Sequence, residues 1–188
     1  MLLKHYSPGR DFSWRQLDEI SAKVDGLWTW PTAALLWLEE NGFIVRNVEA
    51  FSYQDFARLG TEYLINYFGP QVAQEQIDHS NIAQEVALAK IFVRKIASEQ
   101  RIPSVADLQQ SIDDGQFPCC NVNSRKLNGK DGYAGHFVLV IGYDANNLIL
   151  HDPGLPPQEN RRVPKELFEQ AWAYPGDKAK TYFAIKPR

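Results

Sequence analysis

The sequence lacks the features that mark several large classes of protein. Its two cysteines are adjacent, at Cys119 and Cys120, which gives neither a disulfide framework nor the spacing of a metal site. No apolar run approaches the roughly 18 residues of a membrane-spanning helix, and the first residues lack the apolar segment of a secretory signal. A net charge of -3 gives no broad attraction to nucleic acid or to an anionic membrane. These absences predict a reduced, cytoplasmic protein with no metal, no cofactor, no nucleic-acid partner and no membrane insertion.

The composition is that of a folded protein. Apolar residues make up 44% of the 188 residues and aromatic residues 12%, which is enough for a packed core. The chain is long enough for one well-packed domain and short for two. No repeat, low-complexity segment or long linker divides it. We therefore predict a single domain over residues 1–188, while the oligomeric state is not indicated.

An apolar helix is predicted in the first quarter of the chain. Thr29 stands ahead of Pro31 as a candidate N-cap, the apolar residues 33–38 follow, and Gly42 closes the segment. A helix that is apolar on nearly every side is typical of a buried central helix.

The remaining elements indicate an α+β fold with a mostly antiparallel sheet, because helices come first in the chain and strands later. Further helices are predicted from Ser13 to about Lys23, from Ser52 to Gly69-Pro70, over about 81–98, over 104–114 and from Pro164; strands are predicted over 43–45, 117–123, the two arms of a hairpin at 135–152, and 181–186.

The hairpin carries a candidate catalytic pair. Period-2 alternation puts His136 on one face of the first strand together with Val138, and residues 144–147 supply the turn. An antiparallel return brings the end of the second strand back beside the start of the first, so Asp152 is expected next to His136. A carboxylate in this position orients an imidazole for general-base work. A surviving structural hydrogen bond is the alternative role for the same contact.

Several motifs together resemble the papain-like cysteine peptidases, specifically the bacteriocin-processing (double-glycine leader) group. The motifs are Gly135-His136, Gly142-Tyr143-Asp144, Asp152-Pro153 and the helix motif Pro31-Thr32-Ala33-Ala34-Leu35. The resemblance covers most of the chain, with residues 52–100 least distinctive. It implies a papain-like fold, in which a helical N-terminal half with a buried central helix packs on a mostly antiparallel sheet from the C-terminal half. It also implies a peptide-binding cleft containing His136 and Asp152.

Two positions of the implied site depart from the family pattern. Where the family has its nucleophilic cysteine this chain has Thr29, and near the place of the oxyanion glutamine it has Lys23. A thiol is a good nucleophile because its pKa, about 8.5 when free, is easily lowered. A threonine hydroxyl does not ionise so readily, and threonine nucleophiles use their own α-amino group as base, which an internal Thr29 lacks. The catalysis of the family is therefore not expected to transfer.

Other residues near the implied site have alternative interpretations. Trp28 and Trp30 flank Thr29 and either belong to the core or line the cleft as substrate-binding residues. The stretch 123–135 is either a solvated loop or a mobile loop over the site. Cys119 and Cys120 point to opposite sides of their strand, and could form a strained vicinal disulfide or offer a relocated thiol to His136.

Two functions follow from these observations. The first is a degenerate peptidase domain that is catalytically impaired and binds a peptide or protein segment in its relic cleft. The resemblance supports it, because peptidase-like domains of some haemolysin-type transporters have lost the cysteine and recognise their cargo. The alternative is a working hydrolase or acyltransferase on peptide or amide bonds, with a nonstandard nucleophile.

Overall fold

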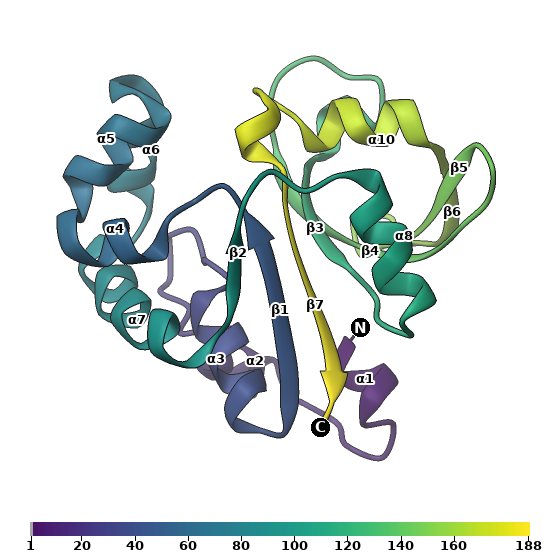
Figure 1. Ribbon diagram of the computed structural model, residues 1–188, viewed down its shortest axis with the longest axis horizontal. Helices are drawn as coiled ribbons and strands as arrows, with labels where there is room; N and C mark the ends of the chain where they lie inside the picture. The colour runs from purple at the N-terminus through teal and green to yellow at the C-terminus, as the bar shows by residue number, and fades with distance from the viewer. Residues whose placement is uncertain (1) are drawn as a thin grey trace. The chain divides into compact units, whose positions relative to one another are not determined.

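The computed structural model describes residues 2–188 and has the expected mixed α+β architecture (Figure 1). Its internal contacts divide the chain into two compact units. Of the described residues, unit 1 comprises 2–45, 51–97 and 187–188, and unit 2 comprises 46–50 and 98–186. The single domain over 1–188 stays a prediction. None of the helices within residues 2–188 is long and apolar enough to span a membrane.

Unit 1 is built from helices. They are α1 (Leu2–Tyr6), α2 (Trp14–Ile20), α3 (Thr32–Glu40), α4 (Tyr53–Leu59), α5 (Thr61–Phe68), α6 (Pro70–His79) and α7 (Ile82–Lys95). The predicted capping box at Ser13 is present at the start of α2, and Asn81 caps α7 by accepting from the backbone N–H of Gln84. These local capping signals explain why both starts could be read from the sequence.

The expected role of Thr29 as an N-cap is wrong. Helix α3 begins at Thr32, with Pro31 in the N-cap position and no side-chain cap. The reason is Pro31, because a proline disfavours helical backbone angles in the residue before it and so keeps Trp30 out of the helix. The helix itself is buried on most sides, through Thr32 and three leucines, as its apolar sequence predicts.

The segment predicted as one helix from Ser52 to Gly69-Pro70 is broken. Ser52 caps α4 as expected, but Gly60 has a φ of +57° and separates α4 from α5. Pro70 then starts α6 rather than ending a helix, since proline suits the first helical position, where no backbone N–H is required.

A seven-stranded, mostly antiparallel sheet confirms the predicted fold class. Its strands are β1 (Phe43–Glu49), β2 (Ser98–Gln100), β3 (Cys119–Asn123), β4 (Gly135–Tyr143), β5 (Asn147–Asp152), β6 (Gln158–Pro164) and β7 (Thr181–Pro187). They lie in the order β2-β1-β7-β3-β4-β5-β6. The pair β1–β2 is parallel, whereas β7, β3, β4, β5 and β6 pair antiparallel along the sheet.

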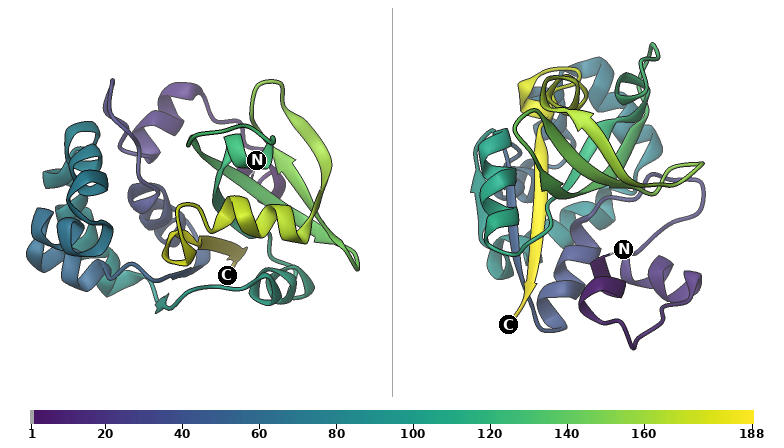
Figure 2. Two further views of the ribbon diagram at one scale, coloured as in Figure 1. Left: turned by 90° about the horizontal axis from the view of Figure 1, so that it is seen from above. Right: turned by 90° about the vertical axis from the view of Figure 1, so that its right-hand side faces the viewer.

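The core of unit 2 forms between this sheet and two helices, α8 (Val105–Asp113) and α10 (Lys165–Trp172). Figure 2 shows α10 lying across strands that it contacts, among them β3, β5 and β6. Phe168 and Trp172 of α10 are fully buried there, with Val138 and Val140 of β4. The face of β4 that begins with His136 is therefore anchored in the core from Val138 onward.

Strand β6 and a short helix, α9 (Ser124–Leu127), are among the elements of unit 2 that the sequence did not predict. Strand β6 has a polar sequence, Gln-Glu-Asn-Arg-Arg-Val-Pro, because it is the edge strand of the sheet and buries only Val163. Helix α9 lies in the stretch that was expected to be a loop.

Candidate functional site

His136 and Asp152 are in direct contact. The Nε2 atom of His136 lies 2.6 Å from Oδ1 of Asp152. The imidazole is partly exposed, with 24% of its side-chain surface accessible, while the carboxylate is buried at 8%. The arrangement is a surface-facing imidazole backed by a buried carboxylate.

The strand register explains why the two side chains meet. Leu139 of β4 pairs with His151 of β5, so the next residue, Asp152, lies beside Val138. Val138 and His136 share a face of β4, which puts the carboxylate one diagonal step from the imidazole. His151 points to the opposite face, as its position in the alternation predicts.

Asp152 is held in its ionised form. Burial acts to raise the pKa of Asp152, but hydrogen bonds from His136, from the backbone N–H of Gly154 and from Arg161 outweigh it, so the pKa lies below its ordinary value. An ionised carboxylate can only accept hydrogen bonds, so Nε2 of a neutral His136 must carry the proton. The lone pair of Nδ1 is then available to take up a proton, as a general base requires.

Sequence reasoning missed two residues of this site. Arg161 of β6 donates to Oδ2 of Asp152 at 2.9 Å, and the N–H of Gly154 donates to Oδ1 at 3.0 Å. Gly154 also has a steric role. A Cβ there would lie 3.0 Å from Oδ1 of Asp152 and 3.6 Å from Nε2 of His136, so the backbone approaches this closely because the residue is glycine.

The stretch before His136 is tied to the sheet by Asn123, which is 1% exposed. Its side-chain oxygen accepts from the backbone of Arg125 and Ala134, and its amide donates to the carbonyl of Gly132. Gly135 then leaves room for the hydroxyl of Tyr133, which would be 2.9 Å from a Cβ at that position. Packing against Tyr133 is thus a physical reason for the Gly in the Gly-His motif.

The other predicted site residues, Thr29 and Lys23, lie in unit 1. Both are exposed, and Nζ of Lys23 is 3.4 Å from a carboxylate oxygen of Asp18. His136 and Asp152 belong to unit 2. We predicted that the imidazole faces the start of the helix after Thr29. Because this concerns residues of two different units, it stays a prediction.

Trp28 and Trp30 dock their segment onto unit 1. The Trp28 ring stacks on His79 with centroids 4.9 Å apart, and its backbone N–H donates to the carbonyl of His79. Trp30 donates through Nε1 to Oγ of Ser80 at 3.0 Å and stacks on Phe56. Trp28 nevertheless keeps 48% of its surface exposed.

Cys119 and Cys120 are free and buried, and no vicinal disulfide joins them. Burial raises the pKa of the Cys119 thiol to about 12 and places that of Cys120 well above its ordinary value. A thiol that stays protonated is a poor nucleophile. This argues against the alternative in which a cysteine of β3 serves as the nucleophile for His136.

A second buried acid lies in unit 1. Glu85 of α7 is 5% exposed, and its Oε2 has no hydrogen-bond partner among residues 2–188. Burial raises the pKa of Glu85, and the nearby hydroxyl of Thr32, at the start of α3, offsets part of the effect. The junction of α3 and α7 therefore favours a neutral carboxyl group.

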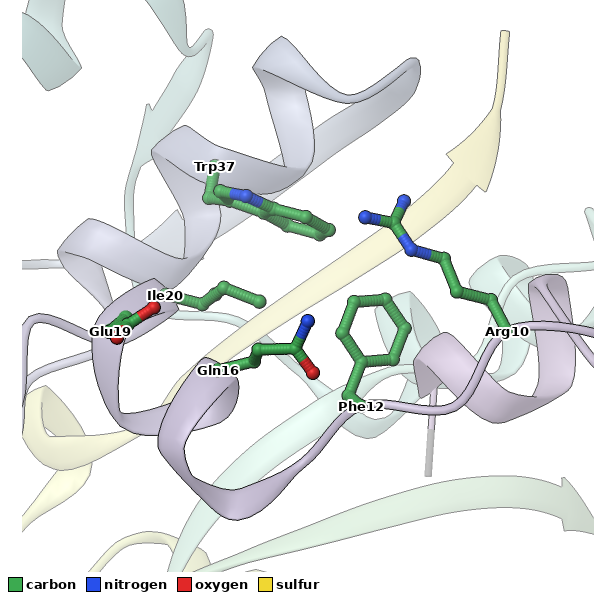
Figure 3. A pocket seen from close by; sticks show the side chains of 6 residues that line it. All are labelled: Arg10, Phe12, Gln16, Glu19, Ile20 and Trp37. Carbon is green, nitrogen blue, oxygen red and sulfur yellow. The ribbon is translucent and has the colours of Figure 1, made fainter.

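One pocket of unit 1, with a volume of about 280 Å³, is shown in Figure 3. The guanidinium of Arg10 lies 4.8 Å from the centre of the Phe12 ring. The lining residues are Arg10, Phe12, Gln16, Glu19, Ile20 and Trp37. None of the predicted site residues lines it. Across residues 2–188, no group of three or more His, Cys, Asp or Glu side chains is placed to hold a metal ion.

A mixed α+β fold with an imidazole backed by a carboxylate on neighbouring strands is the arrangement expected of a peptidase-like protein. The model of the Peptidase_C39 like family matches residues 60–180, which is more than half of the chain. The chain therefore belongs to this family. The matched range includes His136 and Asp152 and begins after Thr29, so the match carries no information about the nucleophile position.

One solved structure is similar in part. It is a crystal structure of a candidate C39-like peptidase from Bacillus anthracis, with 25% sequence identity and a TM-score of 0.40. The similarity covers 55% of this chain and 58% of that one, so it spans little more than half of the solved chain. No curated protein matches the sequence.

Proposed function

We propose that this peptidase-like domain is catalytically impaired and binds a peptide or protein segment at the site of His136 and Asp152. One combination of observations carries the proposal. The chain has the histidine and carboxylate expected of a cysteine peptidase, with Nε2 of His136 2.6 Å from Oδ1 of Asp152. Thr29, however, stands where the resemblance places the nucleophilic cysteine. A threonine hydroxyl ionises much less readily than a thiol, and an internal Thr29 lacks the free α-amino group that threonine nucleophiles use as their base.

Three further observations support binding without cleavage. The only cysteines, Cys119 and Cys120, are buried with raised pKa values, so they supply no thiolate. Near the place where the resemblance puts the oxyanion glutamine the chain has Lys23, and loss of one such donor alone costs about 10²–10³ in rate. The exposed face of Trp28 offers apolar contact for a peptide side chain. The cytoplasmic location belongs to the same proposal.

The alternative function is an active hydrolase or acyltransferase with a nonstandard nucleophile. The observation that favours it is the state of the His136–Asp152 pair, because the carboxylate is ionised and Nδ1 of the imidazole is available as a base. Such an enzyme would use the hydroxyl of Thr29, or a water activated by the imidazole.

The first prediction tests the proposal by restoring the missing groups. The double change Thr29→Cys and Lys23→Gln adds a thiol and an amide donor to a protein that already has His136 and Asp152. We expect measurable hydrolysis of a double-glycine leader peptide by this variant and none by the parent, and labelling of residue 29 by a thiol-reactive peptide probe. Labelling should disappear when His136→Ala is added.

The matched control is Thr29→Ser with Lys23→Gln, which has the amide and a hydroxyl but no thiol. It should stay inactive and should bind the leader peptide as the parent does, measured by fluorescence anisotropy. Turnover by the parent that is lost in both Thr29→Ala and His136→Ala would overturn the proposal and establish the alternative.

A further inference from the structure

We propose that Arg161 is a positioning residue of the His136–Asp152 pair: it aims the carboxylate at the imidazole, helps to keep it ionised, and fixes α9 in the same contact. Arg161 lies on the polar edge strand β6, outside every motif of the sequence. Its guanidinium donates to Asp152 through Nη1 and to the end of α9 through Nη2.

The charge of Asp152 calls for such a partner. The Asp152 side chain is 8% exposed and that of Arg161 is 15% exposed, so both charges are largely removed from water. A buried carboxylate is costly unless it is paired and hydrogen-bonded. Arg161 occupies Oδ2 at 2.9 Å and leaves Oδ1 to His136 at 2.6 Å. The two oxygens are thereby assigned to different partners, and this division fixes the rotation of the carboxylate.

The second amino group of Arg161 extends the contact to α9. Nη2 donates to the carbonyl of Leu127 at 2.9 Å and to Oδ1 of Asn128 at 3.0 Å. Leu127 is the last residue of α9 and is 1% exposed. Because a guanidinium is planar and rigid, one side chain sets the positions of Asp152 and of α9 together.

The segment held in this way leads directly to His136. Its ends, at Arg125 and Ala134, are joined by the side chain of Asn123, and Arg161 secures its first turn at Leu127. Two residues after Ala134 comes His136. Arg161 thus acts on the carboxylate by direct contact and on the chain that carries the imidazole through α9.

The test replaces Arg161 and follows Asp152 itself. In Arg161→Gln we expect the pKa of Asp152, measured by ¹³C NMR of its carboxyl carbon, to move up from the wild-type value. The matched control is Arg162→Gln on the same strand, where the arginine is 63% exposed and pairs with Asp144 instead. The control should titrate at Asp152 as the wild type does. In the Thr29→Cys, Lys23→Gln protein, Arg161→Gln should lower turnover about tenfold or more, the effect typical of losing an outer partner of a functional group.

An unchanged titration of Asp152 in a folded Arg161→Gln variant would overturn the inference. If that variant does not fold, the inference is tested on the wild-type protein by NMR of its arginine side chains. Its Arg161 should show two distinct, slowly rotating Nη groups in ¹⁵N NMR, of which Nη1 shifts when Asp152 is protonated, while the more exposed Arg162 rotates faster. Equally fast rotation of both arginines would overturn the inference.

The inference rests on the proposed function in treating His136 and Asp152 as the site, but its NMR readouts need no ligand. Turnover by the wild type would therefore overturn the proposed function and leave the role of Arg161 intact.

Discussion

At the scale of single residues, Gly154 controls how closely the backbone approaches the His136–Asp152 contact. Its N–H donates to the same carboxylate oxygen that binds the imidazole. A methyl group at this position would be 3.0 Å from that oxygen, which is closer than ordinary van der Waals contact, so the carboxylate has to move. The pair is thus sensitive to a change of one carbon atom outside both of its members.

We therefore expect Gly154→Ala to weaken the His136–Asp152 hydrogen bond and to destabilise the protein by about 1 kcal/mol. The signature is loss of the low-field ¹H resonance of the His136 Nε2 proton. Gly176→Ala is the matched control, because a Cβ there has no neighbour within 4 Å. If both variants keep the resonance, the steric argument for Gly154 is wrong.

The contact between His136 and Asp152 could be predicted from the sequence because both lie in a hairpin with regular alternation and a clear turn. Arg161 could not, since β6 is a polar edge strand whose sequence shows no alternation of apolar residues. The hydrogen bonds made by Asn123 could not be predicted either, for a related reason. They are side-chain to backbone bonds whose partners are set by the local chain path, which no periodicity reports.

At the scale of elements, the packing of α3 on α7 buries an acid, Glu85, whose Oε2 has no hydrogen-bond partner among residues 2–188. Burial is the main reason that the pKa of Glu85 is raised, and the charged form is therefore disfavoured in the folded state. A raised pKa in the folded state means that stability is fully present below the unfolded value, near 4.5, and is lost as the pH rises through the folded value.

We expect Glu85→Gln to stabilise unit 1 at pH 8 by about 1 kcal/mol and to have a smaller effect at pH 4, where the native carboxyl is already neutral. Urea unfolding followed by tryptophan fluorescence measures both values. Glu62→Gln, an exposed position on α5, serves as the control and should change neither. A stabilisation by Glu85→Gln that is equal at both pH values would contradict this account.

The boundaries of elements were predictable where a side chain caps a helix, as at Ser13, Ser52, Asn81 and Ser104. The boundaries were not predictable where glycine or proline in the backbone, rather than a capping side chain, sets the end of a helix. Gly60 breaks a helix through its positive φ, and Pro31 delays the start of α3 beyond Thr29. Glycine and proline each permit more than one local outcome, so tertiary packing chooses between them.

At the scale of the whole molecule, Glu85 of unit 1 and two acids of unit 2 respond to pH in opposite directions. In unit 2 the pKa of Asp107 is lowered, chiefly by hydrogen bonds from Arg101, and that of Asp152 is lowered despite its burial. Acids with lowered pKa values contribute stability above the unfolded value, near 3.8, that is lost as the pH falls below it. Glu85, whose pKa is raised, instead lowers the stability as the pH rises above about 4.5.

The thermal stability of the chain should therefore decline on both sides of a maximum near pH 4–5, as far as these groups determine it. Differential scanning calorimetry from pH 3 to pH 8 measures the curve. Asp107→Asn should flatten the acid side and leave the slope above pH 5 unchanged. A steep acid side that persists in this variant would show that other carboxylates dominate.

The path of the chain through the two units has a consequence for how they can be separated. The chain passes from one unit to the other at four peptide bonds, 45–46, 50–51, 97–98 and 186–187, and β1 is itself divided by the first of them. Unit 2 needs residues 46–50, and unit 1 needs 187–188. No single cut yields two complete units, so neither can be inherited, exchanged or expressed as one continuous gene fragment. Expressing either unit alone would require joining separate segments of the gene.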